Sequence, residues 1–478
     1  MRYFLALPTI SIAVFVLALT GCEVGPDYQK PEAALPNTWI SDEAKQMTAK
    51  AEIDQEWWKN FNDPVLTQLI DKAAANNFDL KIAEARIAQA RANVSSTEAD
   101  LLPKGDIKGS ATREANQFAF PGGTDSPITP LLHKPFNIFQ TGFDASWELD
   151  VFGGSRRAEE SAEAQLQSSE ASRDDILVSM LAEVARTYVD IRSLQSQFST
   201  AQDIIAADKK TLDIAQQRFD AGEAPRLDIT QAEAAQEQAQ SSLPQIRTQL
   251  TQAELAMDVL LGEQPGATQK IVEKAAPLPT SNKALILAAP ASVIAQRPDI
   301  RMAERKLAAA TAQQGMAVAK FFPDISLNGF LGVLNTSVNN LATPANQSWL
   351  ASGSVVWPIL SYGTLSANLD AANAQQQEAM ASYQKSVISA LSDVERSLNA
   401  YTEQEKFLQS VTNEVQKNTH ARDIALERYK GGMTSFVAVL DAERTLYNSQ
   451  NELIKAHADY TQDTIAVYKS LGGGWKKP

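Results

Sequence analysis

The chain has 478 residues, and its 43 lysine and arginine residues are outnumbered by 57 aspartate and glutamate residues, for a formal net charge of −14. This acidic balance argues against a nucleic-acid-binding protein, whose surface would carry a basic patch. A hydrophobic share of 44% argues against a disordered chain, and the length alone predicts about two to four domains.

Residues 1–21 have the pattern of a lipoprotein signal peptide. An apolar run from Ile10 to Leu19 follows a basic residue near the start, and Thr-Gly then leads directly into Cys22. In bacterial lipoproteins the cysteine thiol after such a signal accepts a diacylglycerol. We therefore predict lipidation at Cys22; the alternative is a plain signal peptide that happens to contain a cysteine. The next residue is Glu23 rather than aspartate, which favours sorting to the outer membrane.

Few residues in the chain could form a disulfide or a metal site. Cys22 is the only cysteine, which excludes an intrachain disulfide and a zinc site built on cysteines. The three histidines, His133, His420 and His457, lie far apart in the sequence, so no metal site is predicted. No apolar run after the signal reaches about 18 residues, so no transmembrane helix is predicted.

Two halves of the chain align with each other as an internal duplication. Residues 76–84 match residues 296–304 at an offset of 220. Further along, the offset falls to 210, because the segment between Pro103 and Trp147 is ten residues longer than its counterpart. Such length variation is typical of loops. The pairs matched at the offset of 210 include Trp147 and Trp357, Arg218 and Arg428, Gly222 and Gly432, and Leu261 and Leu471.

Each half repeats the same order of predicted elements. A helical stretch that ends at a proline is followed by a non-helical stretch, a very long helix broken at a glycine, and a shorter closing helix. These elements span about 64–101, 103–152, 154–218 and 228–262 in the first half, and about 290–320, 323–362, 364–430 and 435–470 in the second. The first structural repeat is therefore predicted at 64–262 and the second at 290–470.

The long helices carry an apolar stripe with the alternating spacing of four and three residues that is typical of coiled-coil packing. The stripe comprises Leu177, Leu181, Val184, Tyr188, Ile191 and Phe198, and it recurs at Val387, Leu391, Val394, Leu398, Tyr401 and Leu408. By itself the stripe indicates an ordinary helical bundle. However, a helix over 154–218 would be roughly 97 Å long, which predicts the wall of a tall cylinder rather than a globule.

The non-helical stretches contain segments in which apolar and polar residues alternate, at 139–151, 325–333 and 349–357. Their lengths suffice for tilted outer-membrane strands, and a soluble antiparallel sheet is the alternative. Two hairpins in one chain cannot close a barrel, and open sheet edges are not tolerated in lipid. A membrane barrel would therefore need strands from several copies. The loops at 119–136 and 336–347 would be its exposed tips.

Several motifs point to one protein family. They are Cys-Glu-Val-Gly-Pro-Asp-Tyr at 22–28, Gln-Arg-Pro-Asp-Ile at 296–300, Arg-Tyr-Lys-Gly-Gly at 428–432, Leu-Asp-Ala-Glu-Arg at 440–444 and Leu-Gly-Gly-Gly-Trp at 471–475. Together with the duplication, they resemble the TolC-like outer-membrane factors of Gram-negative efflux and secretion systems. The lipoprotein NodT/OprM/CusC branch is the most similar, and the resemblance covers essentially the whole mature chain.

The resemblance implies a mainly α-helical homotrimer with a membrane β-barrel. Each protomer would give four strands to a shared 12-stranded β-barrel and its helices to a periplasmic α-barrel. An equatorial region would come from residues 22–63, the linker 263–289 and the tail 471–478. The chain would reside in the outer membrane, in contact with its lipid and held by a covalent lipid on Cys22. No other cofactor is implied, and neither is nucleic acid.

The implied function is a passive exit duct that carries substrates across the periplasm and outer membrane. A periplasmic adaptor, or membrane fusion protein, would join it to a pump of the proton-driven resistance-nodulation-division class. The sequence has neither a phosphate-binding loop nor a supported nucleophile elbow, so no enzymatic activity is predicted. The alternatives are a structural coiled-coil outer-membrane lipoprotein and a type I secretion duct. The exported substrate does not follow from the sequence.

The two helix tips, at 219–227 and 430–434, each contain a glycine. Gly222 and Gly432 permit the positive φ that a tight turn between helices needs, and ordinary capping of a helix end is compatible with this role. Pro225 departs from the serine that is usual in the first tip of the family. This departure leaves the exact contacts of the tip open.

The resemblance assigns a periplasmic gate to four residues at these tips. Asp228 and Asp441 match gate or pore-lining acids, and threefold symmetry would turn each into a ring of three carboxylates that favours cations. Tyr429 and Arg444 match residues that bond across neighbouring helices to hold the tip shut. The alternative for the two acids is an ordinary position on a solvated helix or near a helix N-terminus, where the helix dipole favours them.

Overall fold

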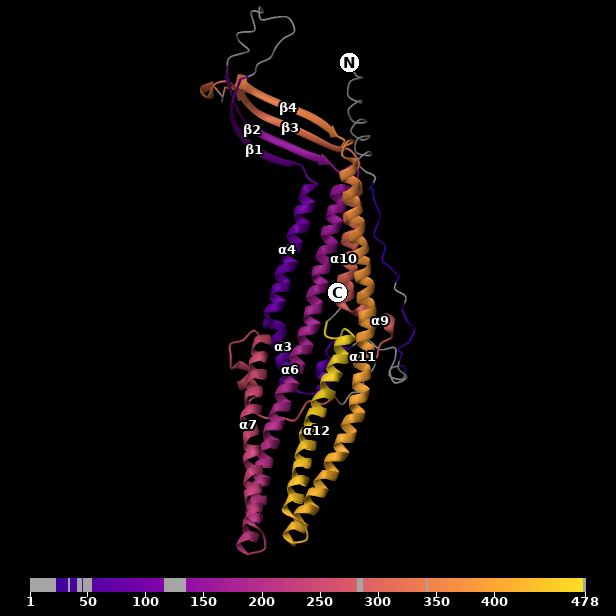
Figure 1. The fold of residues 1–478 in the computed structure, drawn as a ribbon. Helices are drawn as coiled ribbons and strands as arrows, with labels where there is room; N and C mark the ends of the chain where they lie inside the picture. The colour runs from indigo at the N-terminus through magenta and orange to yellow at the C-terminus, as the bar shows by residue number, and fades with distance from the viewer. Residues whose placement is uncertain are drawn as a thin grey trace, which may run out of the picture. The chain divides into compact units, whose positions relative to one another are not determined.

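In the computed structural model, the described residues are 23–32, 35–40, 45, 54–115, 135–281, 287–340 and 343–475. The predicted signal peptide, Cys22 and most of the loop predicted at 119–136 lie outside them. Within the described residues, long helices dominate and one four-stranded sheet accompanies them (Figure 1). The prediction of a mainly α-helical fold with a smaller β-region is therefore confirmed.

The helices follow the same order in both repeats. The first repeat has α3 (Pro64–Asn76), α4 (Phe78–Asp100), α6 (Gly154–Asp220) and α7 (Arg226–Leu260), and the second has α9 (Pro290–Gln296), α10 (Pro298–Ala319), α11 (Tyr362–Lys430) and α12 (Phe436–Ser470). The shorter elements are α8 (Ala267–Val272), η1 (Trp57–Phe61), η2 (Val338–Asn340) and η3 (Pro344–Asn346). None of the described helices is both long and apolar enough to cross a membrane.

The first helical stretch of each repeat differs from the prediction, because it is broken into two helices. Asn77 separates α3 from α4, and its side-chain oxygen accepts hydrogen bonds from the backbone N–H groups of Asp79 (2.8 Å) and Leu80 (3.3 Å). A side chain that caps a helix in this way starts a new helix at that point. In the second repeat, Arg297 has an extended backbone and Pro298 begins α10.

The chain divides into two compact units. The first comprises residues 1–31, 87–168 and 304–382, and the second comprises residues 32–86, 169–303 and 383–478. The helices α4, α6, α10 and α11 contribute residues to both units. The sheet belongs to the first unit, and the helix tips belong to the second.

The sheet contains four antiparallel strands that pair in chain order (Figure 1). They are β1 (Lys104–Glu114), β2 (Phe136–Leu149), β3 (Asp324–Asn335) and β4 (Gln347–Val356). Each repeat supplies one hairpin, and the pairing of β2 with β3 joins the two repeats in one sheet. The described strands thus agree with the expectation of two hairpins per chain.

The strand register gives the two faces of the sheet different chemistry. On one face an apolar row crosses all four strands, through Ile107, Phe143, Leu331 and Trp349. These four side chains are exposed in the chain. On the opposite face, polar rows include Glu148, Ser326 and Ser354, and Ser146, Asn328 and Ser352. A sheet with an exposed apolar face needs a partner or a membrane to cover that face.

The buried core of the second unit joins segments that are far apart in the sequence. The Trp39 indole N–H donates a hydrogen bond to the Ala288 carbonyl oxygen at 3.0 Å. The Trp57 ring stacks on the Tyr468 ring, with 5.5 Å between the ring centroids. Tyr188 of α6 is fully buried in the same cluster. This core therefore links the N-terminal segment and the linker to α6 and α12.

Candidate functional site at the helix tips

The tip turns of the two repeats have the same geometry. Gly222 and Gly432 have φ values of +75° and +72°. In the first tip, the Glu223 N–H donates to the Arg218 carbonyl oxygen at 2.8 Å, and in the second the Met433 N–H donates to the Arg428 carbonyl oxygen at 2.8 Å. This pattern ends a helix with a residue in the left-handed conformation, which glycine adopts without steric cost. Both glycines therefore have the conformation that the predicted tight turn requires.

A hydrogen bond joins the two tips within one chain. The Tyr429 hydroxyl, at the end of α11, donates to Asp228 Oδ2, at the start of α7, across 2.9 Å. Tyr429 is buried, and its ring packs against the Phe436 ring with 5.1 Å between the centroids. Burial and the hydrogen bond to Asp228 together raise the pKa of Tyr429 to about 12. The hydroxyl therefore stays protonated and remains a donor near neutral pH.

Arg218 makes the second contact between the tips. Its guanidinium lies over the Tyr429 ring, 4.6 Å from the centroid, and also donates a hydrogen bond to the Tyr429 carbonyl oxygen. A cation over an aromatic face is attracted by the ring's quadrupole. Arg218 also lies 3.6 Å from the Glu223 carboxylate of its own turn. The end of α6 is thereby fixed to the end of α11.

Asp441 and Arg444 lie on the exposed surface of α12. Arg444 Nη2 is 3.9 Å from Asp441 Oδ1, one helical turn away, and the two side chains are 76% and 66% exposed. An exposed ion pair of this kind contributes little to stability. In the single chain, Arg444 thus contacts its own helix. Its predicted bond across neighbouring helices and the pore-lining role of Asp441 stay predictions.

Asp228 occupies a different environment from Asp441. Its side chain is only 8% exposed, and it lies in the first turn of α7. Within one chain its carboxylate faces Tyr429 rather than open solvent, and the dipole at the helix N-terminus stabilises its negative charge. Its role as a gate acid stays a prediction, and its hydrogen-bond partner Tyr429 is another of the predicted gate residues.

Next to the tips, α6 and α12 share a buried polar layer that the sequence did not reveal. The Thr211 hydroxyl donates to Glu443 Oε1 at 2.8 Å, and the Tyr447 hydroxyl donates to Asp208 Oδ1 at 3.0 Å. The pKa of Glu443 is raised to about 7, mainly by burial and also by the nearby Asp208 charge, while the hydrogen bond from Thr211 and the charge of Arg422 act to lower it. Burial also raises the pKa of Asp208. The layer therefore holds two carboxylates whose pKa values are raised by burial.

A groove of about 930 Å³ runs along these helices beside the polar layer. Its lining combines side chains of α6, α7 and α12, among them Asp208, Gln231, Asp441, Glu443, Arg444 and Tyr447. The groove therefore brings the exposed pair at residues 441 and 444 next to the buried layer. Across the described residues, no group of histidine, cysteine, aspartate and glutamate side chains is arranged to hold a metal ion.

Sequence reasoning identified part of this site. The sequence motifs pointed to the two glycines, Asp228, Tyr429, Asp441 and Arg444. It missed Arg218 as a contact residue, although the repeat alignment had paired Arg218 with Arg428, next to Tyr429. The signal that could have identified Arg218 was this pairing, because its counterpart Arg428 stands directly before the predicted gate residue Tyr429.

Comparison with known proteins gives a consistent result. A family model described as outer membrane efflux protein matches residues 69–263 and 289–473. The chain is 31% identical to the probable efflux pump outer membrane protein TtgC of Pseudomonas putida, over 98% of this chain and 95% of that protein. It is 30% identical to nodulation protein T of Rhizobium leguminosarum bv. trifolii, over 96% of each chain.

A solved structure supports the same relationship. The structure of the outer-membrane channel OprN is similar to this chain with a TM-score of 0.87 and 32% sequence identity, covering 95% of this chain and 100% of that one. The likeness extends over both repeats rather than a single domain, and it agrees with the resemblance inferred from the motifs.

Proposed function

Since the chain belongs to the outer membrane efflux protein family, we propose that three copies form one duct and that each copy carries a lipid on Cys22. The chain is an outer-membrane channel of an efflux system, and it works with an adaptor and an inner-membrane pump. The duct is passive, so it conducts substrates without converting them.

The four-stranded sheet is the observation that best supports a trimer. β1 and β4 are its edges in the described chain, and an apolar row runs across all four strands. Open edges would leave backbone N–H and C=O groups without partners in lipid, at a cost of several kcal/mol for each group. Pairing β4 of one copy with β1 of the next would satisfy these groups. Three copies would supply the twelve strands of a closed barrel.

The gate of this duct is proposed at the helix tips. Tyr429, Asp228 and Arg218 hold the α6–α7 and α11–α12 hairpins together in each copy. The exposed side chains of Asp441 and Arg444 are available to a neighbouring copy. Opening would separate the hairpins in an iris-like movement, and binding of the adaptor would stabilise the open arrangement.

The adaptor is proposed to bind at the tips, where the groove lined by α6, α7 and α12 offers both apolar and charged side chains. The pump is proposed to belong to the proton-driven resistance-nodulation-division class. The name of the relative TtgC, a probable efflux pump component, supports efflux over type I secretion.

Recording from the purified protein in planar lipid bilayers tests the duct. We expect a trimer by light scattering in detergent and discrete single-channel currents in the bilayer. A monomer that binds membranes without conducting would instead favour the structural coiled-coil lipoprotein. Mass spectrometry of the N-terminal peptide tests the lipid separately, because a diacylglycerol and an acyl chain on Cys22 add a mass that signal cleavage alone does not.

The partner class is tested by reconstitution. The channel is combined with an adaptor and pump of the resistance-nodulation-division class, or with those of a type I secretion system, and complex formation is measured by size-exclusion chromatography. Assembly with the first pair supports the proposal, and assembly with the second pair alone would contradict it.

A further inference from the structure

The first described residues of the chain, Glu23 to Tyr28, run along α6 and α10 within the first unit, and we call them the N-terminal strap. The strap follows Cys22 directly in the sequence. None of the motifs assigned to the gate or the sheet accounts for its contacts, which centre on a buried arginine at the start of α6.

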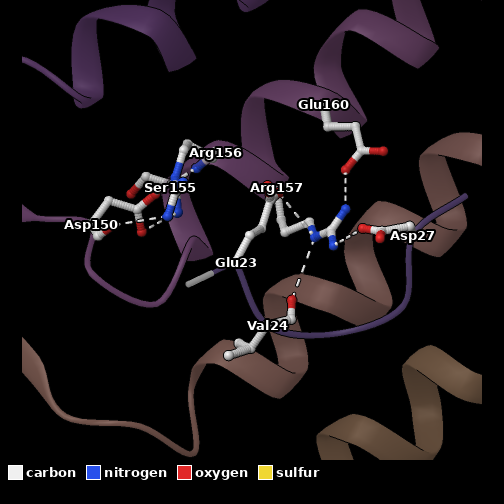
Figure 2. Close-up of polar contacts among 8 residues, drawn as sticks. All are labelled: Glu23, Val24, Asp27, Asp150, Ser155, Arg156, Arg157 and Glu160. Carbon is white, nitrogen blue, oxygen red and sulfur yellow. Dashed lines mark hydrogen bonds and ion pairs between the residues drawn. The ribbon is translucent and has the colours of Figure 1, made fainter. Parts of the chain in front are cut away.

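Arg157 is this arginine, and its side chain is only 3% exposed. Its Nε lies 3.1 Å from a Glu23 carboxylate oxygen, and its Nη2 lies 2.6 Å from Asp27 Oδ1 (Figure 2). A third carboxylate, Glu160 of the same helix, lies 2.6 Å from Nη1. Nε also donates to the Val24 carbonyl oxygen at 3.4 Å. A buried cation is costly without such partners, so the strap supplies most of what Arg157 requires.

The backbone of the strap also approaches α10 too closely for side chains. Gly25 has a φ of +95°, and a Cβ added there would lie 2.6 Å from the Cα of Gly315. A Cβ on Gly315 would in turn lie 2.9 Å from the Arg157 side chain. Glycine at both positions therefore lets the strap, α10 and Arg157 pack against one another.

A second contact fixes the other end of the strap. The Tyr28 hydroxyl donates a hydrogen bond to the Glu304 carboxylate of α10. The guanidinium of Arg305 lies over the Tyr28 ring, 5.3 Å from its centroid, and pairs with the same carboxylate. The strap is thus held at both ends, by Arg157 near its beginning and by this pair at its end.

The beginning of the strap is attached to the turn between the sheet and α6. The Val24 N–H donates to the Phe152 carbonyl oxygen at 3.2 Å. The turn itself is fixed by Asp150, whose carboxylate accepts hydrogen bonds from the backbone N–H groups of Ser155 (3.1 Å) and Arg156 (2.9 Å) (Figure 2). The first residues of the strap are therefore held beside this turn.

We infer that Arg157 is a positioning residue that holds the lipid-bearing N-terminus at the junction of β2 and α6. This inference rests on the proposed lipidation of Cys22. If the six residues of the strap were a free tether, the point of lipid attachment could move over roughly 13 Å. Clamped by Arg157, the strap instead keeps that point within one residue of the junction. The acyl chains would then enter the membrane at a fixed place next to the strands.

Two matched substitutions separate this role from a general structural one. Asp27→Asn and Glu160→Gln each remove one carboxylate that lies 2.6 Å from Arg157. Only Asp27 belongs to the strap, since Glu160 lies on the same helix as Arg157. Arg157→Lys is the third variant, because a lysine ammonium keeps the charge but cannot bridge three carboxylates in the planar geometry of arginine.

The measurement is the mobility of a nitroxide label on Gln29→Cys, an exposed position just after the strap. Lipidation would consume the thiol of the single native cysteine, so the label would attach at residue 29 alone. The full-length protein is reconstituted in phosphatidylethanolamine and phosphatidylglycerol vesicles. Asp27→Asn and Arg157→Lys should each shorten the rotational correlation time about twofold or more. Asp27→Asn should do so with the melting temperature unchanged, because the Asp27 side chain is 83% exposed. Glu160→Gln should leave the spectrum as it is.

Two results would overturn the inference. One is an equal response to Asp27→Asn and Glu160→Gln, and the other is a label that is already mobile in the parent protein. Mass spectrometry of the same samples keeps the two proposals apart. If Cys22 carries no lipid, the anchor and its placement fail together while the channel function stands. If Cys22 is lipidated and the label does not respond to Asp27→Asn or Arg157→Lys, the positioning role alone fails.

Discussion

Tyr429 at the end of α11 and Asp228 at the start of α7 are joined by a hydrogen bond of 2.9 Å. The positions that correspond to them in the other repeat are Phe219 and Ala438, and neither side chain can form this bond. The duplication therefore left this tyrosine–aspartate bond on one side of the tip only. Loss of that connection affects one side of the tip and not its counterpart.

Replacing Tyr429 by phenylalanine removes the hydroxyl and keeps the ring that packs on Phe436. A hydrogen bond to a charged group contributes about 1.5–3 kcal/mol, so Tyr429→Phe is expected to shift the tip equilibrium towards the open state by about tenfold or more. The measurement is the open probability of single channels in planar bilayers.

Tyr401→Phe is the matched control for that experiment. The Tyr401 hydroxyl lies 2.9 Å from the Tyr460 hydroxyl and joins α11 to α12 away from the tip residues. Tyr401→Phe should therefore leave the open probability unchanged. An unchanged open probability for Tyr429→Phe would show that the Tyr429 hydroxyl does not help to keep the tip closed.

Asp441 provides a test of ion selectivity. If three copies present the exposed Asp441 carboxylate to the duct, Asp441→Asn should reduce the preference for cations, because the ring loses its negative charge. Reversal potentials in a potassium chloride gradient measure the change. Arg444→Gln breaks the same 3.9 Å ion pair but keeps the carboxylate, so it should retain or increase cation preference. A matching loss in both variants would assign the effect to the ion pair instead.

The buried carboxylate of Glu443 makes the stability of this region depend on pH. Burial raises its pKa to about 7, whereas the ordinary value is 4.5. Between these values the unfolded chain has released the proton that the folded chain retains. The free energy of unfolding should therefore fall as the pH rises from 4.5 to 7, by up to about 3 kcal/mol from this group.

Glu443→Gln should flatten that pH dependence, because the amide does not titrate. Hydrogen exchange of the α12 amides, followed at several pH values after correction for the intrinsic rate, measures the local effect. Glu452→Gln changes an exposed carboxylate on the same helix and serves as the control. Equal slopes in the parent and in Glu443→Gln would mean that Glu443 ionises in the folded state as it does in the unfolded chain.

Local patterns were enough to predict much of the fold. Alternating residues predicted the strands around Phe143 and Leu331, since strand side chains alternate between two faces. Glycines at 222 and 432 predicted the tip turns, because a positive φ is a property of one residue. The repeat at an offset of 210 predicted that both features occur twice.

Contacts between distant segments were not predictable in the same way. Arg157 pairs with Asp27, which lies 130 residues earlier, and Thr211 bonds to Glu443, which lies 232 residues later. No periodicity in the sequence marks such pairs, because they depend on which helix faces which after folding. The break at Asn77 was missed for a related reason: the capping oxygen of an asparagine competes with helix continuation, and the apolar pattern does not reveal which will prevail.

The apolar face of the sheet gives the last prediction. Leu331 lies in the apolar row between Phe143 and Trp349, and its side chain is 65% exposed in the chain. An arginine on the lipid face of a membrane strand costs about 2–4 kcal/mol near the bilayer centre, so Leu331→Arg should weaken folding into phospholipid vesicles by that amount in a urea titration. Asn328→Arg places the same charge on the polar face of the same strand and should cost much less. Equal losses for the two variants would show that the row containing Leu331 does not face lipid.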